Sequence, residues 1–257
     1  MSIVNSDIAL SFFLQLLLGH VVGDFLLQPY WLVLAKRRGW PGLLLHVWVV
    51  TFTTAILIWN SIPNWWVWVI VLFVGHLFID QFRTFVFIDN SKGKGLLLLI
   101  LDQVAHVMLI WLIAWAATGW TWASLATLPS LNAPNQFHLM AYLIGLATLI
   151  STAPVLEAEV TVAVWAAQGQ EINHTLGIDT SDRVLGGLER ILAMAFILSG
   201  FGLLAPLVFL PRLGLMIFQG QARQNRTQVI TKVVTSLATA VVVSLILFNV
   251  PMPILFV

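Results

Sequence analysis

The sequence contains no cysteine and few charged residues. The absence of cysteine excludes disulfide bonds and thiolate metal sites. Only 9% of the 257 residues are Asp, Glu, Lys or Arg, whereas 60% are hydrophobic, and the mean hydropathy is +0.95. So few charges cannot cover a surface that faces water, and the outer surface is therefore expected to face lipid. This composition indicates an integral membrane protein.

A long basic tract is also missing. The formal net charge is +1, and the Lys and Arg residues form no patch that could follow a phosphate backbone. We therefore expect no nucleic-acid partner. No Lys or Arg precedes the first apolar run, where Asp7 is the only charged residue. The run thus lacks the basic start of a cleaved signal peptide, and we interpret it as a retained membrane helix.

Long apolar runs are abundant. Roughly twenty apolar residues cross the ~30 Å hydrocarbon layer as one helix. Runs of about this length predict an all-α fold, a polytopic membrane helical bundle with about seven transmembrane helices. The runs lie at residues 8–27, 43–59, 65–82, 96–117, 137–155, 185–210 and 233–250.

An uncharged linker at residues 118–136 divides the chain. It separates a four-helix half, residues 1–117, from a second helical half, residues 137–257. The second half is less regular, because Pro154 is expected to break its first apolar run. The sequence thus predicts two parts, of which the first has the clearer helical pattern.

Basic loop residues predict the orientation in the membrane. Those of the first half fall on one side of its four helices: Lys36, Arg37, Arg38, Arg83, Lys92 and Lys94. That side is expected to be cytoplasmic, with the N-terminus outside. Seven crossings would put Arg212, Arg223 and Arg226 outside, against the same rule. Either the Pro154 segment is re-entrant, or one late helix lies in the membrane interface.

Four apolar runs of the first half each carry one histidine, and three of these histidines have an aspartate four residues away. The set consists of His20 with Asp24, His46 alone, His76 with Asp80, and His106 with Asp102. A spacing of four residues puts two side chains on one helix face, about 5.4 Å apart. Ionisable groups in such runs are costly and indicate a functional site.

These groups flank the basic loops, so antiparallel neighbours bring them to one depth inside a bundle. Imidazole and carboxylate suit a divalent ion, zinc first and manganese or iron as alternatives. The predicted metal ligands are His20, His46, His76, Asp80, Asp102 and His106. The predicted catalytic residues are Asp24, Asp80 and Asp102, and the predicted substrate-binding residues are Gln28, Glu189 and Arg190. The surplus of donors suits two ions, or one ion with aspartates that orient the imidazoles.

The same motifs carry a family resemblance. They are G-H-x-x-G-D-F-x-x-Q from Gly19, L-L-x-H from Leu43, G-H-x-x-I-D from Gly75, D-Q-x-x-H from Asp102 and G-G-L-E-R from Gly186. Together they resemble the bacterial inner-membrane family called domain-of-unknown-function family 3307, which implies a multi-pass inner-membrane location and no established activity. The Lys-Ser and Arg-Phe pairs expected beyond Arg212 are missing. A looser resemblance to membrane-bound metal-dependent hydrolases implies ligand roles for the aspartates as well, Asp24 included.

Three functions fit this pattern. In the first, a buried metal ion activates water and hydrolyses a lipid or lipid-linked phosphoester, so that membrane lipid is the partner. The second is transport of a proton or metal ion, against which the one-sided position of the polar groups counts. The third is a subunit that binds haem or another tetrapyrrole, against which the neighbouring aspartates count. A scaffold without chemistry, a homo-oligomer and a place in a larger membrane complex remain open.

Overall fold

The computed structural model describes residues 6–86, 94–119, 135–169, 180–218, 226–248 and 250. The described residues form helices joined by turns, with no strand among them. This confirms the predicted all-α class. Residues 120–134 of the predicted linker lie outside the described part, as do Lys92 and Arg223.

The chain forms two compact units. Unit 1 comprises Met1–Ile88, Ile100–Ile144 and Val250–Val257, and unit 2 comprises Asp89–Leu99 and Gly145–Asn249. All four histidines of the predicted site belong to unit 1, whereas Glu189 and Arg190 belong to unit 2. Each unit is therefore described by itself.

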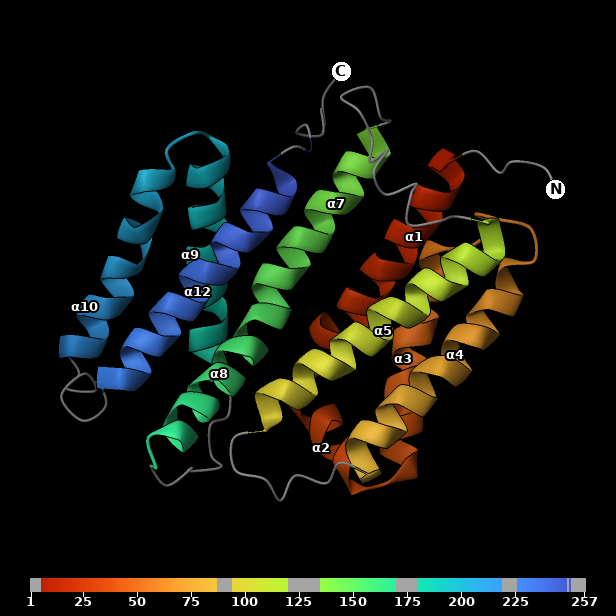
Figure 1. Ribbon diagram of the computed structural model, residues 1–257, viewed down its shortest axis with the longest axis horizontal. Coiled ribbons are helices and arrows are strands. Elements are labelled where there is room, and N and C mark those ends of the chain that lie inside the picture. The colour runs from red at the N-terminus through yellow and green to blue at the C-terminus, as the bar shows by residue number, and fades with distance from the viewer. Residues whose placement is uncertain are drawn as a thin grey trace. The chain divides into compact units, whose positions relative to one another are not determined.

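Unit 1 is built mainly from antiparallel helices (Figure 1). They are α1 (Ser6–Val21), the π-helical turn η1 (Val22–Leu26), α2 (Tyr30–Arg38), α3 (Trp40–Leu57), α4 (Trp65–Gln81), the π-helical turn η2 (Phe82–Val86) and α5 (Gly95–Thr118). Helix α7 (Asn135–Ala147) follows in the chain. Fully buried apolar side chains, among them Phe12, Leu16 and Ile113, form a core between α1 and α5. Burial of this apolar surface holds the helices together.

Unit 2 has its own core. Its helices are the π-helical turn η3 (Thr148–Thr152), α8 (Ala153–Ala167), α9 (Thr180–Leu198), the 3-10 helix η4 (Gly202–Phe209), α10 (Leu210–Phe218) and α12 (Arg226–Leu247). Small and aromatic side chains interlock there, with Ala193, Ala205 and Ala240 around Phe209. The small residues let the helix backbones approach closely.

Six helices of the described residues are long and apolar enough to cross a membrane, as expected of a multi-pass membrane protein. These candidate spans are Asp7–Leu26, Trp40–Leu57, Trp65–Phe85, Gly95–Thr118, Gln136–Ala167 and Thr227–Leu247. They match six of the seven runs expected from the sequence. The unmatched run is the one predicted at residues 185–210.

Pro154 does not break its helix, contrary to the prediction. The helical stretch Gln136–Ala167 runs through it for 32 residues. The turn before Pro154 is π-helical, and Ala153 donates its N–H to the carbonyl of Thr148. A π-helical turn widens the helix by one residue, which is a common way to accommodate a helix irregularity. The re-entrant segment considered above is therefore absent from these residues.

The run predicted at residues 185–210 is a hairpin rather than one span. Helix α9 ends at Leu198, and Gly200 adopts a positive φ of 84°, which glycine tolerates without strain. The N–H of Phe201 closes the helix end on the carbonyl of Phe196 at 2.8 Å, a Schellman cap. Helices η4 and α10 then run back along α9 (Figure 1).

The hairpin changes the number of crossings expected in the second half. Because α10 returns, α12 begins at the same end of unit 2 as α9 (Figure 1). The count of seven crossings, from which the conflict with the positive-inside rule arose, therefore does not hold for the described residues.

Candidate metal centre

The predicted site depends on a close approach of α1 and η1 to α3. A Cβ atom added to Gly19 would lie 2.7 Å from the Thr54 Cα, and one added to Gly23 would lie 2.7 Å from the Val50 Cα. Both distances are too short for any side chain, so glycine is needed at both positions. Small residues four apart are a common way to bring two membrane helices together. Here they bring Asp24, next to Gly23, toward α3.

All seven histidines and aspartates predicted for the site lie inside unit 1. The set is His20, Asp24, His46, His76, Asp80, Asp102 and His106, and none is more than 6% exposed. Polar groups so deeply buried need partners, because their loss of hydration is otherwise uncompensated. Their partners therefore indicate what the cluster can do.

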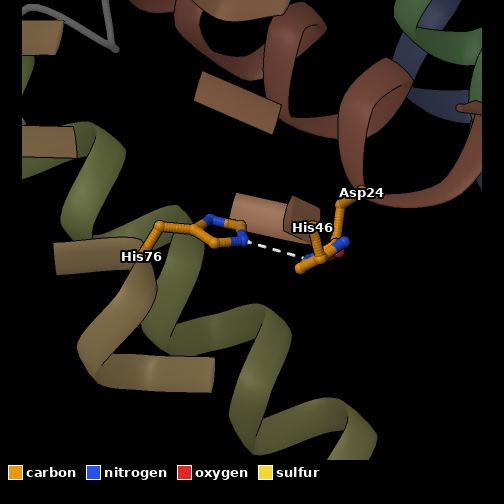
Figure 2. A group of neighbouring side chains, drawn as sticks. All are labelled: Asp24, His46 and His76. Carbon is orange, nitrogen blue, oxygen red and sulfur yellow. Dashed lines mark hydrogen bonds and ion pairs between the residues drawn. The ribbon is translucent and has the colours of Figure 1, made fainter. Parts of the chain in front are cut away.

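His46 lies at the centre of the cluster. Its Nε2 is 3.1 Å from the Asp24 Oδ1, 3.0 Å from the Asp80 Oδ2 and 3.4 Å from the His76 Nε2. Figure 2 shows the His76 ring pointing at His46, with Asp24 on the far side. A neutral imidazole nitrogen carries at most one hydrogen. If both Nε2 atoms carry a hydrogen, the His46–His76 contact pairs two donors; if only one does, the lone pair of the other faces a carboxylate oxygen. Hydrogen bonding alone therefore does not account for this convergence.

Asp24 and Asp80 each direct one carboxylate oxygen toward His46 and accept a hydrogen bond through the other oxygen. Lys36 Nζ donates to the Asp80 Oδ1 at 2.9 Å, and the Gln103 amide Nε2 donates to the Asp24 Oδ2 at 3.4 Å. Each carboxylate thus keeps one oxygen turned toward His46. Outer contacts of this kind fix the orientation of metal-ligating carboxylates in proteins.

The hydrogen bonds of Gln103 also determine which nitrogen of His20 carries the hydrogen. Its amide nitrogen donates to the Asp102 Oδ2 at 3.0 Å, so its carbonyl Oε1 faces the His20 Nε2 at 3.3 Å. A carbonyl oxygen only accepts, so the His20 Nε2 must carry the hydrogen and has no lone pair for a metal. The His20 ring stacks on the His106 ring, with the centroids 4.9 Å apart.

His106 has the opposite arrangement. Its Nδ1 donates to the main-chain carbonyl of Asp102 at 2.8 Å, so its Nε2 carries a lone pair. That Nε2 is buried and has no hydrogen-bond partner among the described residues. The His76 ring lies close, with the two ring centroids 4.2 Å apart. The His106 Nε2 is therefore a free donor atom next to the other donors.

Two overlapping groups have ligand atoms that all lie within 4.8 Å of one another: Asp24, His46 and His76, and His76, Asp80 and His106. Of the six predicted ligands, His46, His76, Asp80 and His106 belong to these groups. Asp24, predicted as catalytic, joins them. His20 and Asp102 do not, and their contacts with Gln103 give them an outer position.

Sequence reasoning missed three residues of the cluster. Lys36 and Arg83 served only as indicators of orientation, and Gln103 was seen only as a letter of the D-Q-x-x-H motif. Arg83 Nη1 donates to the Asp102 Oδ2 at 2.7 Å. The Lys36 side chain is 11% exposed and that of Arg83 is 28% exposed. These cations mark the edge of the cluster nearest the surface of unit 1.

Gln28 lies outside the helix that carries His20 and Asp24. Turn η1 ends at Leu26, and Gln28 lies in the connection before α2. The spacing of four residues from Asp24 predicts the same helix face for Gln28, and this prediction is wrong because the helix ends at Leu26. Its role in substrate binding stays a prediction.

Glu189 and Arg190 belong to a separate buried cluster in unit 2. Arg190 Nη1 donates to the Glu157 Oε2 at 3.1 Å and to the Ser236 Oγ at 2.9 Å. Arg212 Nη2 donates to the Glu157 Oε1 at 3.1 Å, and its Nη1 to the Glu189 Oε2 at 3.4 Å. Both oxygens of Glu157 are thus held by guanidinium groups. Substrate binding by Glu189 and Arg190 stays a prediction.

Residues 12–134 match the model of a family described as a protein of unknown function, DUF3307. Over this stretch, the chain is similar to the DUF3307 family, as its motifs predict. Every residue of the unit 1 cluster lies within the match, whereas the Gly186 to Arg190 motif lies beyond it. Searches of the curated proteins and of the solved structures gave no match.

Proposed function

We propose that unit 1 binds a divalent metal ion and uses it to hydrolyse a lipid or lipid-linked phosphoester. The observation that carries the proposal is the convergence of three polar atoms on the His46 Nε2, for which no placement of the ring hydrogens makes every contact a hydrogen bond. A bound cation would accept lone pairs from all members of one donor group, either Asp24, His46 and His76 or His76, Asp80 and His106. It also offsets the repulsion between the Asp24 and Asp80 carboxylates.

The distances between these donor atoms support a shared ion. Metal bonds of 2.0–2.2 Å separate neighbouring tetrahedral ligands by about 3.3–3.6 Å and octahedral ones by about 2.8–3.1 Å. The His46–His76 distance of 3.4 Å and the His76–Asp80 distance of 3.5 Å fall in the first range. The distances of 3.0 and 3.1 Å from His46 to the two carboxylates fall in the second. Nitrogen and oxygen donors favour zinc first, then manganese or iron.

A divalent ion supplies hydroxide at neutral pH, which is the chemistry that hydrolysis needs. The water oxygen forms a bond to phosphorus, the bond from phosphorus to the leaving alcohol oxygen breaks, and that oxygen takes up a proton. Of the three aspartates, Asp80 and Asp102 each pair with a lysine or an arginine, whereas Asp24 contacts the Gln103 amide and the His46 and His20 imidazoles. Asp24 is therefore the best general base for the proton that the water loses.

The surroundings of the cluster support a lipid substrate. The residues that carry it lie on candidate membrane spans, and the partly exposed Arg83 marks its accessible edge. A substrate can then enter from the membrane or its interface. We place the protein in the bacterial inner membrane with the N-terminus outside and the basic loops in the cytoplasm. In that orientation the cluster lies in the cytoplasmic half.

Transport is a weaker candidate. A pathway needs polar groups along the whole of the bundle. A core of apolar side chains in unit 1 instead includes Phe12, Leu16 and Ile110, which are at most 1% exposed. Haem is disfavoured too, because the His46 and His76 nitrogens lie 3.4 Å apart. Two axial ligands on opposite sides of one iron are separated by about 4 Å.

Elemental analysis of detergent-purified protein, before and after chelation, tests the proposal. We expect one or two equivalents of a divalent metal in the wild type and background metal in the double variant His76→Ala with Asp80→Ala. Turnover of a fluorescent phospholipid should be lost with the metal. His138→Ala is the matched control, because His138 is a buried histidine of unit 1 outside both donor groups. Full metal content in the double variant would refute the proposal.

A further inference from the structure

We infer that the substrate of the proposed metal centre is a phosphodiester monoanion, and that Lys36 and Arg83 bind its phosphoryl oxygens. This inference rests on the proposed function. The observation behind it is that two cations, from neighbouring elements, each hold one carboxylate of an otherwise apolar and buried cluster.

The two cations come from one edge of unit 1. Lys36 belongs to the last turn of α2, and Arg83 belongs to η2. The two elements contact each other, and the Trp40 and Phe85 rings pack nearby with centroids 5.6 Å apart. Lys36 and Arg83 are more exposed than the carboxylates that they hold. An anion that approaches the cluster from this edge meets both cations first.

The charges of the cluster point to the class of anion. With the imidazoles neutral and the aspartates ionised, as metal binding requires, three carboxylates and two cations carry one net negative charge. One divalent ion changes this to one net positive charge. An uncompensated charge in an apolar interior is costly, so a bound monoanion is favoured. A phosphodiester carries one negative charge, whereas a phosphomonoester carries close to two at neutral pH.

The cations are also suited to phosphoryl oxygens. A guanidinium group has five N–H donors in a planar fork, and Asp102 accepts from Arg83 through Nη1. Lysine adds a mobile point charge with three donors. Lys36 holds only the outer oxygen of Asp80, so it can contact a phosphoryl oxygen while the inner oxygen stays with the histidines. The same contacts that orient the aspartates can therefore position a diester.

The test uses metal-loaded, detergent-purified full-length protein and two soluble probes with the same leaving group. These are the diester bis(4-nitrophenyl) phosphate and the monoester 4-nitrophenyl phosphate. We expect kcat/KM to be at least tenfold higher for the diester. Phosphatidylglycerol in mixed micelles, itself a diester monoanion, forms a third arm. Faster turnover of this lipid than of its water-soluble, deacylated form glycerophosphoglycerol, which has the same leaving group, identifies a membrane lipid as the source, and the reverse identifies a soluble diester.

Lys36→Gln and Arg83→Gln should each raise KM for the diester by about tenfold, the usual effect of losing one charge-assisted hydrogen bond. Because Lys36 and Arg83 also orient aspartates, the assays contain excess metal, and metal content under these conditions should stay close to that of the wild type. Lys36→Arg keeps the charge and should restore most of the affinity. Arg37→Gln is the matched control, because Arg37 is exposed and adjacent in sequence.

The outcomes separate the two proposals. Protein without metal overturns the proposed metal centre, and metal-loaded protein that hydrolyses no probe overturns the hydrolysis. Metal-loaded protein that prefers the monoester overturns the diester inference alone. An unchanged KM in both Lys36→Gln and Arg83→Gln, with metal bound, likewise overturns the role of the two cations.

Discussion

The substitution Gly23→Ala tests whether helix spacing sets the geometry of the metal centre. The added Cβ would lie 2.7 Å from the Val50 Cα, whereas ordinary contact begins at 3.4 Å. Because the obstacle is backbone, η1 and α3 must separate by about 0.7 Å, the difference between those two distances. Asp24 follows Gly23 directly, and His46 lies one turn before Val50 on α3.

The Asp24 Oδ1 and the His46 Nε2, now 3.1 Å apart, would move apart by a similar amount. Metal sites tolerate deviations of only about 0.2 Å in their bond lengths. We therefore expect the affinity for zinc to fall by about 10–100-fold, as when residues that orient ligands are lost. This loss would occur although Gly23 itself contacts no metal ligand side chain.

The assay is a competition titration of chelated protein with a zinc-binding dye, with circular dichroism as the measure of helix content. Gly187→Ala is the matched control, because its added Cβ would lie 3.8 Å from the nearest atom, Ile150 Cα, an ordinary contact. The control should bind zinc like the wild type. A folded Gly23→Ala variant with wild-type zinc affinity would show that the approach of the two helices does not determine donor geometry.

Three further predictions concern the contacts around both clusters. Gln103→Leu removes the hydrogen bonds that Gln103 makes with His20, Asp24 and Asp102. Zinc affinity should therefore fall about tenfold with unchanged stoichiometry, as measured by the dye titration. Arg190→Ala removes a guanidinium partner from the buried carboxylate of Glu157. The free energy of unfolding should drop by about 3–5 kcal/mol in a denaturant titration, with metal content unchanged. Lowering the pH should weaken zinc binding in the same titration, because protonated imidazoles cannot coordinate a metal.

The sequence was sufficient to predict that the four histidines and three aspartates of the motifs gather in unit 1. A charged or imidazole side chain has few favourable positions in an apolar helix, so a repeated spacing of four residues on successive helices indicates a shared interior face. His46, His76 and Asp80 meet as this argument predicts. The spacing could not show which of these residues belong to the donor groups and which lie around them. That distinction depends on which oxygen or nitrogen atom faces which neighbour.

The partners from outside the motifs could not be predicted for a similar reason. Lys36 reaches Asp80 across 44 positions in sequence, from the short helix α2 that folds back over the bundle. Gln103 lies next to Asp102, but it also reaches His20 and Asp24 on α1 and η1. Contacts of this kind follow from tertiary packing and leave no periodic signal in the chain.

The continuity of the helix through Pro154 has a cause that also lies elsewhere in the chain. In a π-helical turn each carbonyl accepts from the residue five positions later, so the partner of the Leu149 carbonyl would be Pro154, which has no N–H. Arg190 Nε donates to that carbonyl at 2.8 Å. The guanidinium group thus replaces the missing donor. Local propensity predicts a break at Pro154 because it does not include Arg190, which lies 41 positions after Leu149 in the sequence.

The two buried clusters differ in how their polar atoms are satisfied, and this difference separates structure from function. In unit 2 each oxygen of Glu157 accepts from an arginine, and Ser236 adds a third donor, so the carboxylate is fully matched. In unit 1 two imidazole nitrogens and two carboxylate oxygens meet at His46, and no placement of the ring hydrogens makes every one of their contacts a hydrogen bond. Buried polar groups retained for packing normally find complementary partners. Donors that converge without enough hydrogens are expected where a cation binds, which favours a structural role for Arg190 and a metal-binding role for His46.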